Sequence, residues 1–250
     1  MSNERVKTVV EDIVDAVCDV FRKHEVTFDE YRAGFMHLID TGENHEIGLL
    51  LDMFFNQTIC DIEMKDRQGT RSNVEGPYFL EGAPLVTDEV KVCGDTEPLL
   101  IRGVVKDIKG NPIPDAEVDL WWANPEGKYS GYTDDLPMEY FRGKVNTDAE
   151  GKYCVMGSMP MEYSIATEQH GPTGELIEML GGQGVRTKHI HQKYRKAGYQ
   201  TLTTQAYFSG AAYLDEDPVK AVFEDLTYDL KEEDGRPVLD LEIVIDVVKA

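Results

Sequence analysis

The chain has 250 residues, of which 41% are hydrophobic and 29% charged, and its formal net charge is −22. Such an acidic excess excludes general nucleic-acid binding, which needs a basic surface to replace the counterions of the phosphates. No apolar run approaches the ~20 residues of a membrane span. The first residues lack the basic and then apolar pattern of a signal peptide, so we expect a cytoplasmic protein.

Residues 4 to about 65 are predicted to be helical. Thr27 followed by Glu30 fits a capping box, which should begin a second helix. Apolar residues recur before it at spacings of three and four, which is typical of one helical stripe: Val6, Val9, Val10, Ile13, Val14, Val17, Val20 and Phe21. This stripe either packs on the rest of the chain or forms part of a dimer interface.

From about residue 70 onward, short β-like runs alternate with turn signals. Regular short strands with tight turns favour an antiparallel β-sandwich. A short helix should interrupt them near 171–180. The strands are expected at 99–105, 117–122, 144–147, 152–156, 187–194, 201–208 and 240–248.

The cysteines are widely spaced and form no C-x-x-C pair: Cys18, Cys60, Cys93 and Cys154. Structural zinc sites usually contain such closely spaced pairs. In a cytoplasmic chain we therefore expect free thiols that pack as small hydrophobic residues.

The most informative pair of residues is His189 and His191, with Arg186 ahead of them. Side chains of a strand alternate faces, so both imidazoles should project from one face, roughly 6–7 Å apart at the backbone. That geometry suits two ligands of one metal ion. Taken alone, the pair is equally compatible with half-exposed strand histidines.

Two tyrosines follow predicted strands upstream of this pair, at positions where loops carry chemistry. Tyr129 lies after a strand rich in tryptophan, and Tyr163 lies just past another strand. Either one could instead be an ordinary amphipathic tyrosine, with its ring in the core and its hydroxyl at the surface.

The stretch from about 73 to 210 resembles the intradiol ring-cleavage dioxygenases, non-haem ferric enzymes that open catechols between their two hydroxyls. Its similarity is closest to the shorter, chlorocatechol-type members, and the N-terminal helices also fit. The resembling pieces occur in the order of the family: EGPYF at 75–79 with EGAP at 81–84, WWAN at 121–124 with GKYS at 127–130, TDAEGKY at 147–153, Tyr163, GPTG at 171–174, Arg186 with the histidine pair, and LTTQ at 202–205.

The resemblance implies a fold that is mostly β with N-terminal α. Residues 1–70 would be a helical dimerisation region, and residues 71–250 a β-sandwich catalytic domain. The expected partners are a small catechol, O2 and a second copy of the chain, which would form a homodimer through the N-terminal helices. In related enzymes a lipid lies at that dimer interface.

By the same resemblance, one Fe(III) per subunit would be bound by Tyr129, Tyr163, His189 and His191, without an organic cofactor. Phenolates are hard anions that favour Fe(III), whereas two histidines with a carboxylate suit Fe(II). Tyr163 would be the axial ligand that leaves when substrate binds. Arg186 and Gln205 would lie beside the substrate, where Arg186 stabilises negative charge that develops on the ring.

The chain departs from the family pattern at two places. Thr187 and Lys188 replace the usual Pro-Ala between Arg186 and the first histidine, and Trp122 replaces the usual histidine after Trp121. The loss of the proline loosens the constraint on that turn, but the spacing from arginine to histidine is kept.

The resemblance also places a set of residues around the substrate ring: Leu49, Asp52, Met53, Gly76, Tyr78 and Val219. Asp52 is polar in an otherwise apolar helix, so it is either a helix-surface aspartate or a polar wall of the pocket. Met53 is an adaptable side chain that could make room for a ring substituent.

Three alternatives remain open from the sequence. The enzyme could be a hydroxyquinol 1,2-dioxygenase. Residues 101–153 also match a prealbumin-like sandwich that serves as a binding module and has no ferric site. A zinc or ferrous enzyme of the cupin type would need a carboxylate ligand, and no suitably placed one stands out.

Overall fold

The computed structural model describes residues 3–165 and 171–248, and the termini and residues 166–170 lie outside it. The chain divides into two compact units, Met1–Ile47 and Gly48–Ala250. The family resemblance places the boundary at 70/71 instead, and that functional division stays a prediction.

The first unit contains the helices α1 (Asn3–His24) and α2 (Phe28–Glu43). The predicted capping box is confirmed: the Thr27 hydroxyl accepts from the Glu30 amide, and the Glu30 carboxylate accepts from the Thr27 amide at 2.8 Å. No residue of α1 is buried, so its apolar stripe is exposed. Exposed apolar stripes of this kind mark interaction surfaces.

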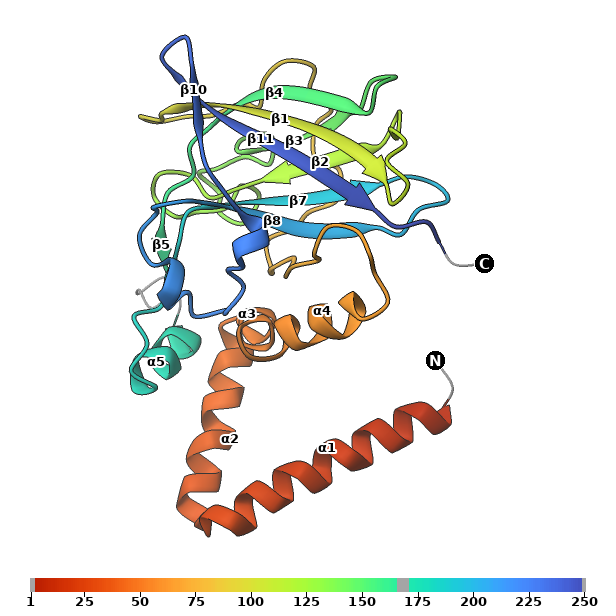
Figure 1. Cartoon of the computed structure of the whole chain (residues 1–250). Helices are drawn as coiled ribbons and strands as arrows, with labels where there is room; N and C mark the ends of the chain where they lie inside the picture. Colours follow the sequence, from red (N-terminus) through yellow and green to blue (C-terminus); the bar gives the residue numbers. More distant parts are fainter. Residues whose placement is uncertain (1–2, 166–170, 249–250) are drawn as a thin grey trace. The chain divides into compact units, whose positions relative to one another are not determined.

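The second unit begins with short helical segments and continues into two stacked sheets (Figure 1). The segments are α3 (Ile47–Leu51), the π-helical turn η1 (Asp52–Asn56) and α4 (Gln57–Met64), and α5 (Gly171–Met179) is the predicted short helix.

The four-stranded sheet has the order β10-β11-β1-β4, and the five-stranded sheet has the order β3-β2-β7-β8-β9. A third, two-stranded sheet pairs β5 with β6. The strands are β1 (Pro98–Asp107), β2 (Glu117–Trp121), β3 (Arg142–Asn146), β4 (Lys152–Ser158), β5 (Tyr163–Ser164), β6 (Val185–Arg186), β7 (His189–Arg195), β8 (Leu202–Phe208), β9 (Thr227–Tyr228), β10 (Lys231–Glu233) and β11 (Arg236–Ile245).

The sandwich is confirmed, but its sheets are mixed rather than purely antiparallel. β1 pairs with β11 in parallel over Leu100–Asp107, and β8 pairs with β9 in parallel. The period-two alternation of a strand is the same for both pairing directions, so it does not predict which one occurs.

The five-stranded sheet lies between two different cores. In β2, Val118 and Leu120 belong to the core between the sheets, together with Ile190 and Tyr194 of β7. Trp121 belongs to a second core on the other face, which also includes residues of α3, η1 and α4. The metal-ligand candidates of β7 lie on this second face, which the helical segments α3 and α4 cover in Figure 1.

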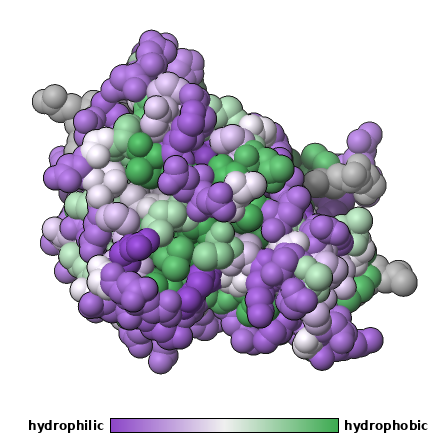
Figure 2. Space-filling view, turned by 90° about the horizontal axis from the view of Figure 1, so that it is seen from above, coloured by the Kyte–Doolittle hydropathy of each residue, from purple (hydrophilic) through white to green (hydrophobic). Residues whose placement is uncertain are grey.

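The surface is largely polar: the face shown in Figure 2 is mostly hydrophilic, with smaller hydrophobic areas among the polar side chains. No helix in the described part of the chain is long and apolar enough to cross a membrane. All four cysteines are free, as predicted, but the expected packing as small hydrophobic residues is wrong for Cys93 and Cys154, which are exposed; only Cys60 is buried.

Candidate active site

The two histidines of β7 point in the same direction, as the period of the strand predicts. Their Nε2 atoms are 3.2 Å apart, and their exposed fractions are only 2% for His189 and 1% for His191. The alternative of half-exposed strand histidines is therefore wrong. Two buried imidazole nitrogens at this distance suit a shared metal ion better than a partnership with solvent.

Tyr129 completes a compact group of donor atoms with them. Its hydroxyl oxygen lies 3.2 Å from the Nε2 atom of each histidine and 3.4 Å from the hydroxyl oxygen of Tyr163. Both tyrosines are buried. The structure thus brings together all four side chains that the sequence resemblance names as ligands.

A close backbone approach makes the meeting of the tyrosines possible. Tyr129 follows a turn in which the Gly127 amide donates to Asn124 O at 3.0 Å. Gly127 has φ +77°, and a Cβ atom there would lie 2.6 Å from the Cβ atom of Tyr163. Only glycine tolerates both conditions, so this turn can pass directly against the strand that begins at Tyr163.

The spacing of the donor atoms fits one metal ion. A four-coordinate ion with ligand bonds of about 2.0–2.1 Å separates its ligand atoms by about 3.3–3.4 Å. The three separations from the Tyr129 oxygen and the one between the two histidine Nε2 atoms are 3.2–3.4 Å. Over residues 3–165 and 171–248, no group of three or more His, Cys, Asp or Glu side chains could hold a metal. A cupin-type site with a carboxylate ligand is thus not supported, and the phenols are the remaining donors.

Burial sets the protonation states of this group. It raises the pKa of the Tyr129 phenol well above 10.0, and the neighbouring Tyr163 raises it further. Burial also raises the pKa of Tyr163, although the Arg186 charge opposes that shift. The pKa values of both imidazoles fall well below 6.5, first through burial and then through nearby positive groups. The histidines are therefore neutral, with lone pairs available, and the phenols need a cation in order to ionise.

The ring of His189 is oriented by the residue that departs from the family pattern. Its Nδ1 atom lies 2.6 Å from Thr187 O, which leaves Nε2 free to bind a metal. The Thr187 hydroxyl in turn donates to Ala212 O at 2.6 Å. This side-chain hydrogen bond supplies a restraint on the turn where the usual proline is missing.

The register of the sheet gives His191 its neighbours. Four paired residues lie side by side across β3, β2, β7 and β8. Arg142 is opposite Trp121, Trp121 is opposite His191, and His191 is opposite Gln205. The Trp121 ring stacks on the His191 ring with centroids 4.9 Å apart and an interplanar angle of 7°. This stacking holds the imidazole plane in place.

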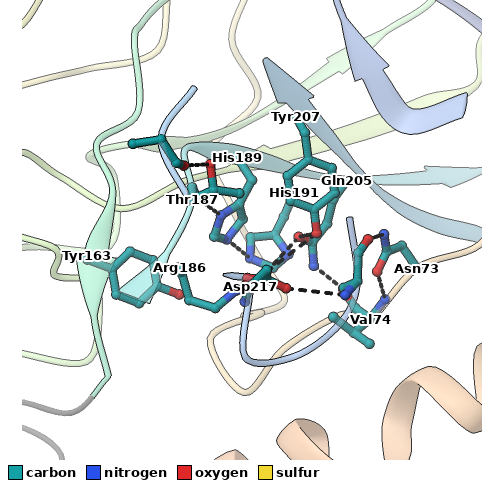
Figure 3. Close-up of polar contacts among 12 residues, drawn as sticks. Asn73, Val74, Tyr163, Arg186, Thr187, His189, His191, Gln205, Tyr207 and Asp217 are labelled. Carbon is teal, nitrogen blue, oxygen red and sulfur yellow. Dashed lines mark hydrogen bonds and ion pairs between the residues drawn. The ribbon is translucent and has the colours of Figure 1, made fainter. Parts of the chain in front are cut away.

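Arg186 belongs to a buried polar network beside the ligands, as Figure 3 shows. Strand pairing places it opposite Tyr163 in the small sheet. Its Nε atom donates to Asp217 Oδ1 at 2.6 Å, and its Nη2 atom donates to Gln205 Oε1 at 3.2 Å. The predicted closeness of Arg186 and Gln205 is thus found in the structure.

Two members of this network were missed from the sequence. Asp217 is the buried ion-pair partner of Arg186, and the Tyr207 hydroxyl donates to Gln205 Oε1 at 2.7 Å. Gln205 is further fixed by its Nε2 atom, which donates to Val74 O at 2.7 Å. A weak signal existed for Tyr207, which is two residues from Gln205 in β8 and so shares its face.

A small cavity adjoins the donor group. All six residues predicted to surround the substrate line it. The complete lining is Leu49, Asp52, Met53, Val74, Gly76, Pro77, Tyr78, Tyr163, Ile165, Arg186, His191 and Val219. The sequence interpretation missed Val74, Pro77 and Ile165.

Asp52 is half-buried and lines the cavity, so it is more than a helix-surface aspartate. Burial raises the pKa of its carboxyl, while a hydrogen bond from Asn56 Nδ2 at 2.8 Å opposes that shift. It forms a polar point on an otherwise largely apolar wall.

The chain matches two family profiles that together span nearly its whole length. The profile described as dioxygenase matches residues 74–249, and the profile described as the catechol dioxygenase N terminus matches residues 3–71. A chlorocatechol 1,2-dioxygenase from Pseudomonas sp. strain P51 is 44% identical over 98% of this chain and 97% of its own length.

Solved structures agree with these matches. The crystal structure of a chlorocatechol 1,2-dioxygenase from Pseudomonas putida superposes with a TM-score of 0.92 at 40% identity, over 98% of this chain and 100% of that one. A hydroxyquinol 1,2-dioxygenase from Pseudomonas putida DLL-E4 is more distant, with a TM-score of 0.88 at 27% identity, over 99% of this chain and 94% of that one. From the donor group, the sandwich and these matches together, it follows that the chain belongs to the intradiol ring-cleavage dioxygenases, the family of the catechol dioxygenases.

Proposed function

We propose that this chain holds one Fe(III) between Tyr129, Tyr163, His189 and His191 and uses O2 to cleave catechol or chlorocatechols between their hydroxyls, giving cis,cis-muconates. The observation that carries the proposal is the convergence of four donor atoms beside a cavity: the Tyr129 hydroxyl oxygen lies within 3.4 Å of the Tyr163 hydroxyl oxygen and of the Nε2 atoms of both histidines.

The donor set supports ferric iron in particular. Intradiol dioxygenases use iron, and two phenolates are hard ligands that favour the ferric state. When bound, Fe(III) would supply a Lewis acid that draws electron density from a catecholate and makes its ring carbon reactive toward O2. No organic cofactor is needed for this chemistry.

The cavity distinguishes the two tyrosines. Tyr163 lines it, whereas Tyr129 lies behind, stacked against the Tyr78 ring with centroids 4.4 Å apart. Substrate that enters the cavity therefore meets Tyr163 first. This supports the assignment of Tyr163 as the ligand that leaves, with its phenolate oxygen accepting a proton from a catechol hydroxyl.

Arg186 would stabilise the negative charge of the substrate. It lines the same cavity, and its guanidinium is fixed by Asp217 and Gln205. A charge that is already oriented costs no reorganisation when negative charge develops on the ring. Gln205 would act with it, since the two side chains share a hydrogen bond of 3.2 Å.

The choice of substrate rests on the relatives and on the cavity wall. The relative at 44% identity is a chlorocatechol enzyme, and the hydroxyquinol enzyme matches at 27%. Met53 is unbranched and adaptable, so it can adjust to a ring substituent. We therefore favour catechol and chlorocatechols over hydroxyquinol as substrates.

We further propose that the helices within residues 1–70 form a homodimer. The exposed apolar stripe of α1 supports this assembly. A light-scattering mass of a single chain at working concentrations would contradict it. A lipid at the dimer interface and a cytoplasmic location stay predictions.

Protein loaded with ferric iron should be wine-red, because charge transfer from tyrosinate to Fe(III) absorbs visible light. Anaerobic catechol should shift that band, and admission of air should yield cis,cis-muconate. Absorption spectra and product chromatography check both expectations. A colourless protein that contains one iron per chain would contradict the proposal and favour the binding-module alternative.

Tyr163→Phe should retain iron but lose turnover by about 10²-fold or more, because the group that accepts the substrate proton is removed. His191→Ala should lose iron instead, since it removes a donor that would stay bound, whereas Tyr163 is the donor that substrate would displace. Metal analysis and muconate formation separate the two effects, and Tyr199→Phe, outside the site, serves as the control. Wild-type turnover in Tyr163→Phe would refute the assigned role.

Arg186→Ala and Asp217→Asn break the same buried ion pair, so each should lower the free energy of unfolding by about 3–5 kcal/mol. Only Arg186→Ala removes the cation, and it should lower kcat/KM by about 10²–10³-fold. Asp217→Asn should lower it much less. Urea unfolding and steady-state kinetics check the pair, and equal turnover in both variants would remove the role of Arg186.

A further inference from the structure

We propose that Arg142 and Tyr132 are positioning residues for substrate selection. Together they donate to the backbone carbonyls of residues 77–79 and thereby hold the backbone that carries the Tyr78 ring, which stacks on Tyr129. This proposal rests on the proposed function, because it treats Tyr78 as part of the wall of the cavity that would bind the catechol.

We call Arg142 and Tyr132, which donate to the carbonyls of residues 77–79, the clamp. Arg142 is its central part. It lies at the start of β3, opposite Trp121 in the sheet register, so its side chain emerges on the face that carries the metal ligands. Its exposed fraction is 1%. Its Nη2 atom donates to Tyr78 O at 2.9 Å and to Ser130 O at 3.0 Å, while Nε donates to Ser130 Oγ at 3.1 Å.

These acceptors belong to two different loops. Ser130 directly follows the ligand candidate Tyr129, and Tyr78 lines the substrate cavity. Because one rigid guanidinium binds both, a shift of either loop breaks its hydrogen bonds. A buried guanidinium whose hydrogen bonds are lost is costly, so the loops are held in one arrangement.

Tyr132 shares its single hydroxyl proton between the carbonyls on either side of Tyr78. Its hydroxyl lies 2.8 Å from Pro77 O and 3.1 Å from Phe79 O. Its ring meets the Tyr78 ring edge-on, with centroids 5.3 Å apart and an interplanar angle of 84°. Tyr78 thus has a hydrogen bond at its own carbonyl, a shared hydrogen bond at the neighbouring carbonyls and an edge-on contact at its ring.

Gly131, between Ser130 and Tyr132, permits the close approach of the two loops. It has φ +79°, and a Cβ atom there would lie 2.6 Å from Leu80 Cδ1. The loop of residues 129–132 therefore packs directly against the loop of residues 76–80. The consequence is that the wall of the cavity and the ligand Tyr129 move as one body.

The restrained ring limits the space available to a substituent on the substrate. Tyr78 is stacked on Tyr129 with an interplanar angle of 12°, and the hydrogen-bonded backbone keeps its Cα atom where this stacking can form. Release of the clamp should let the ring shift and change the relative fit of catechol and its substituted forms. This effect should appear in KM for the larger substrate more than in kcat.

The test compares Tyr132→Phe and Arg142→Lys with Tyr140→Phe as a matched control. Tyr132 is 45% exposed, so loss of its hydroxyl should not prevent folding. Tyr140 lies in the same connection, outside the clamp, with its ring near Lys91. If Arg142→Lys fails to fold, as circular dichroism would show, Tyr132→Phe decides alone.

Two readouts are needed. The first is limited digestion of the metal-free protein by chymotrypsin, with mass spectrometry of cleavage within residues 78–80. The second is the ratio of kcat/KM for 4-chlorocatechol to that for catechol. Both clamp variants should be cut sooner at this segment, and the ratio should change by about two- to tenfold, the effect of losing one hydrogen bond.

Wild-type behaviour of Tyr132→Phe in either readout, or an equal change in Tyr140→Phe, overturns the clamp. If the iron-loaded wild-type enzyme cleaves neither catechol, the proposed function fails. In that case the rate of cleavage within residues 78–80 still shows whether the clamp restrains the loop. Failure of the clamp and failure of the proposed function are therefore distinguishable.

Discussion

The candidate active site depends on the burial of four polar side-chain atoms beside one another. The Tyr129 hydroxyl oxygen lies within 3.4 Å of the Tyr163 hydroxyl oxygen and of both imidazole Nε2 atoms, inside the protein. Burial raises the phenol pKa values and lowers the imidazole pKa values, so the group is neutral and well suited to receive a cation. A bound ferric ion would satisfy all four atoms together.

The sandwich positions these atoms through simple alternation. One face of β7 packs in the core between the sheets, and the other presents His189 and His191 to the helical segments α3 and α4. Register then adds Trp121 and Gln205 on either side of His191. The tyrosines come from outside this sheet, and the clamp at Arg142 ties the loop of one of them back to it.

The difference between the histidines, which lie on one strand, and the tyrosines, which come from outside the sheet, explains what could be predicted from the sequence. The geometry of the histidine pair follows from the period of a strand, and the capping box predicts the start of α2. Tyr129 and Tyr163 could be assigned only through the family resemblance, because their meeting depends on the turn at Gly127. Asp217 lies 31 residues from Arg186, and no local pattern links an ion pair across that distance. The parallel pairing of β1 with β11 was missed for the same reason.

The most direct test of the account is the position of the metal. Crystals of the iron-loaded protein should show one anomalous peak at the iron absorption edge, about 2 Å from the oxygens of Tyr129 and Tyr163 and from the Nε2 atoms of both histidines. A peak elsewhere, or an iron whose ligands exclude both tyrosines, would contradict the ferric site on which the proposed function rests.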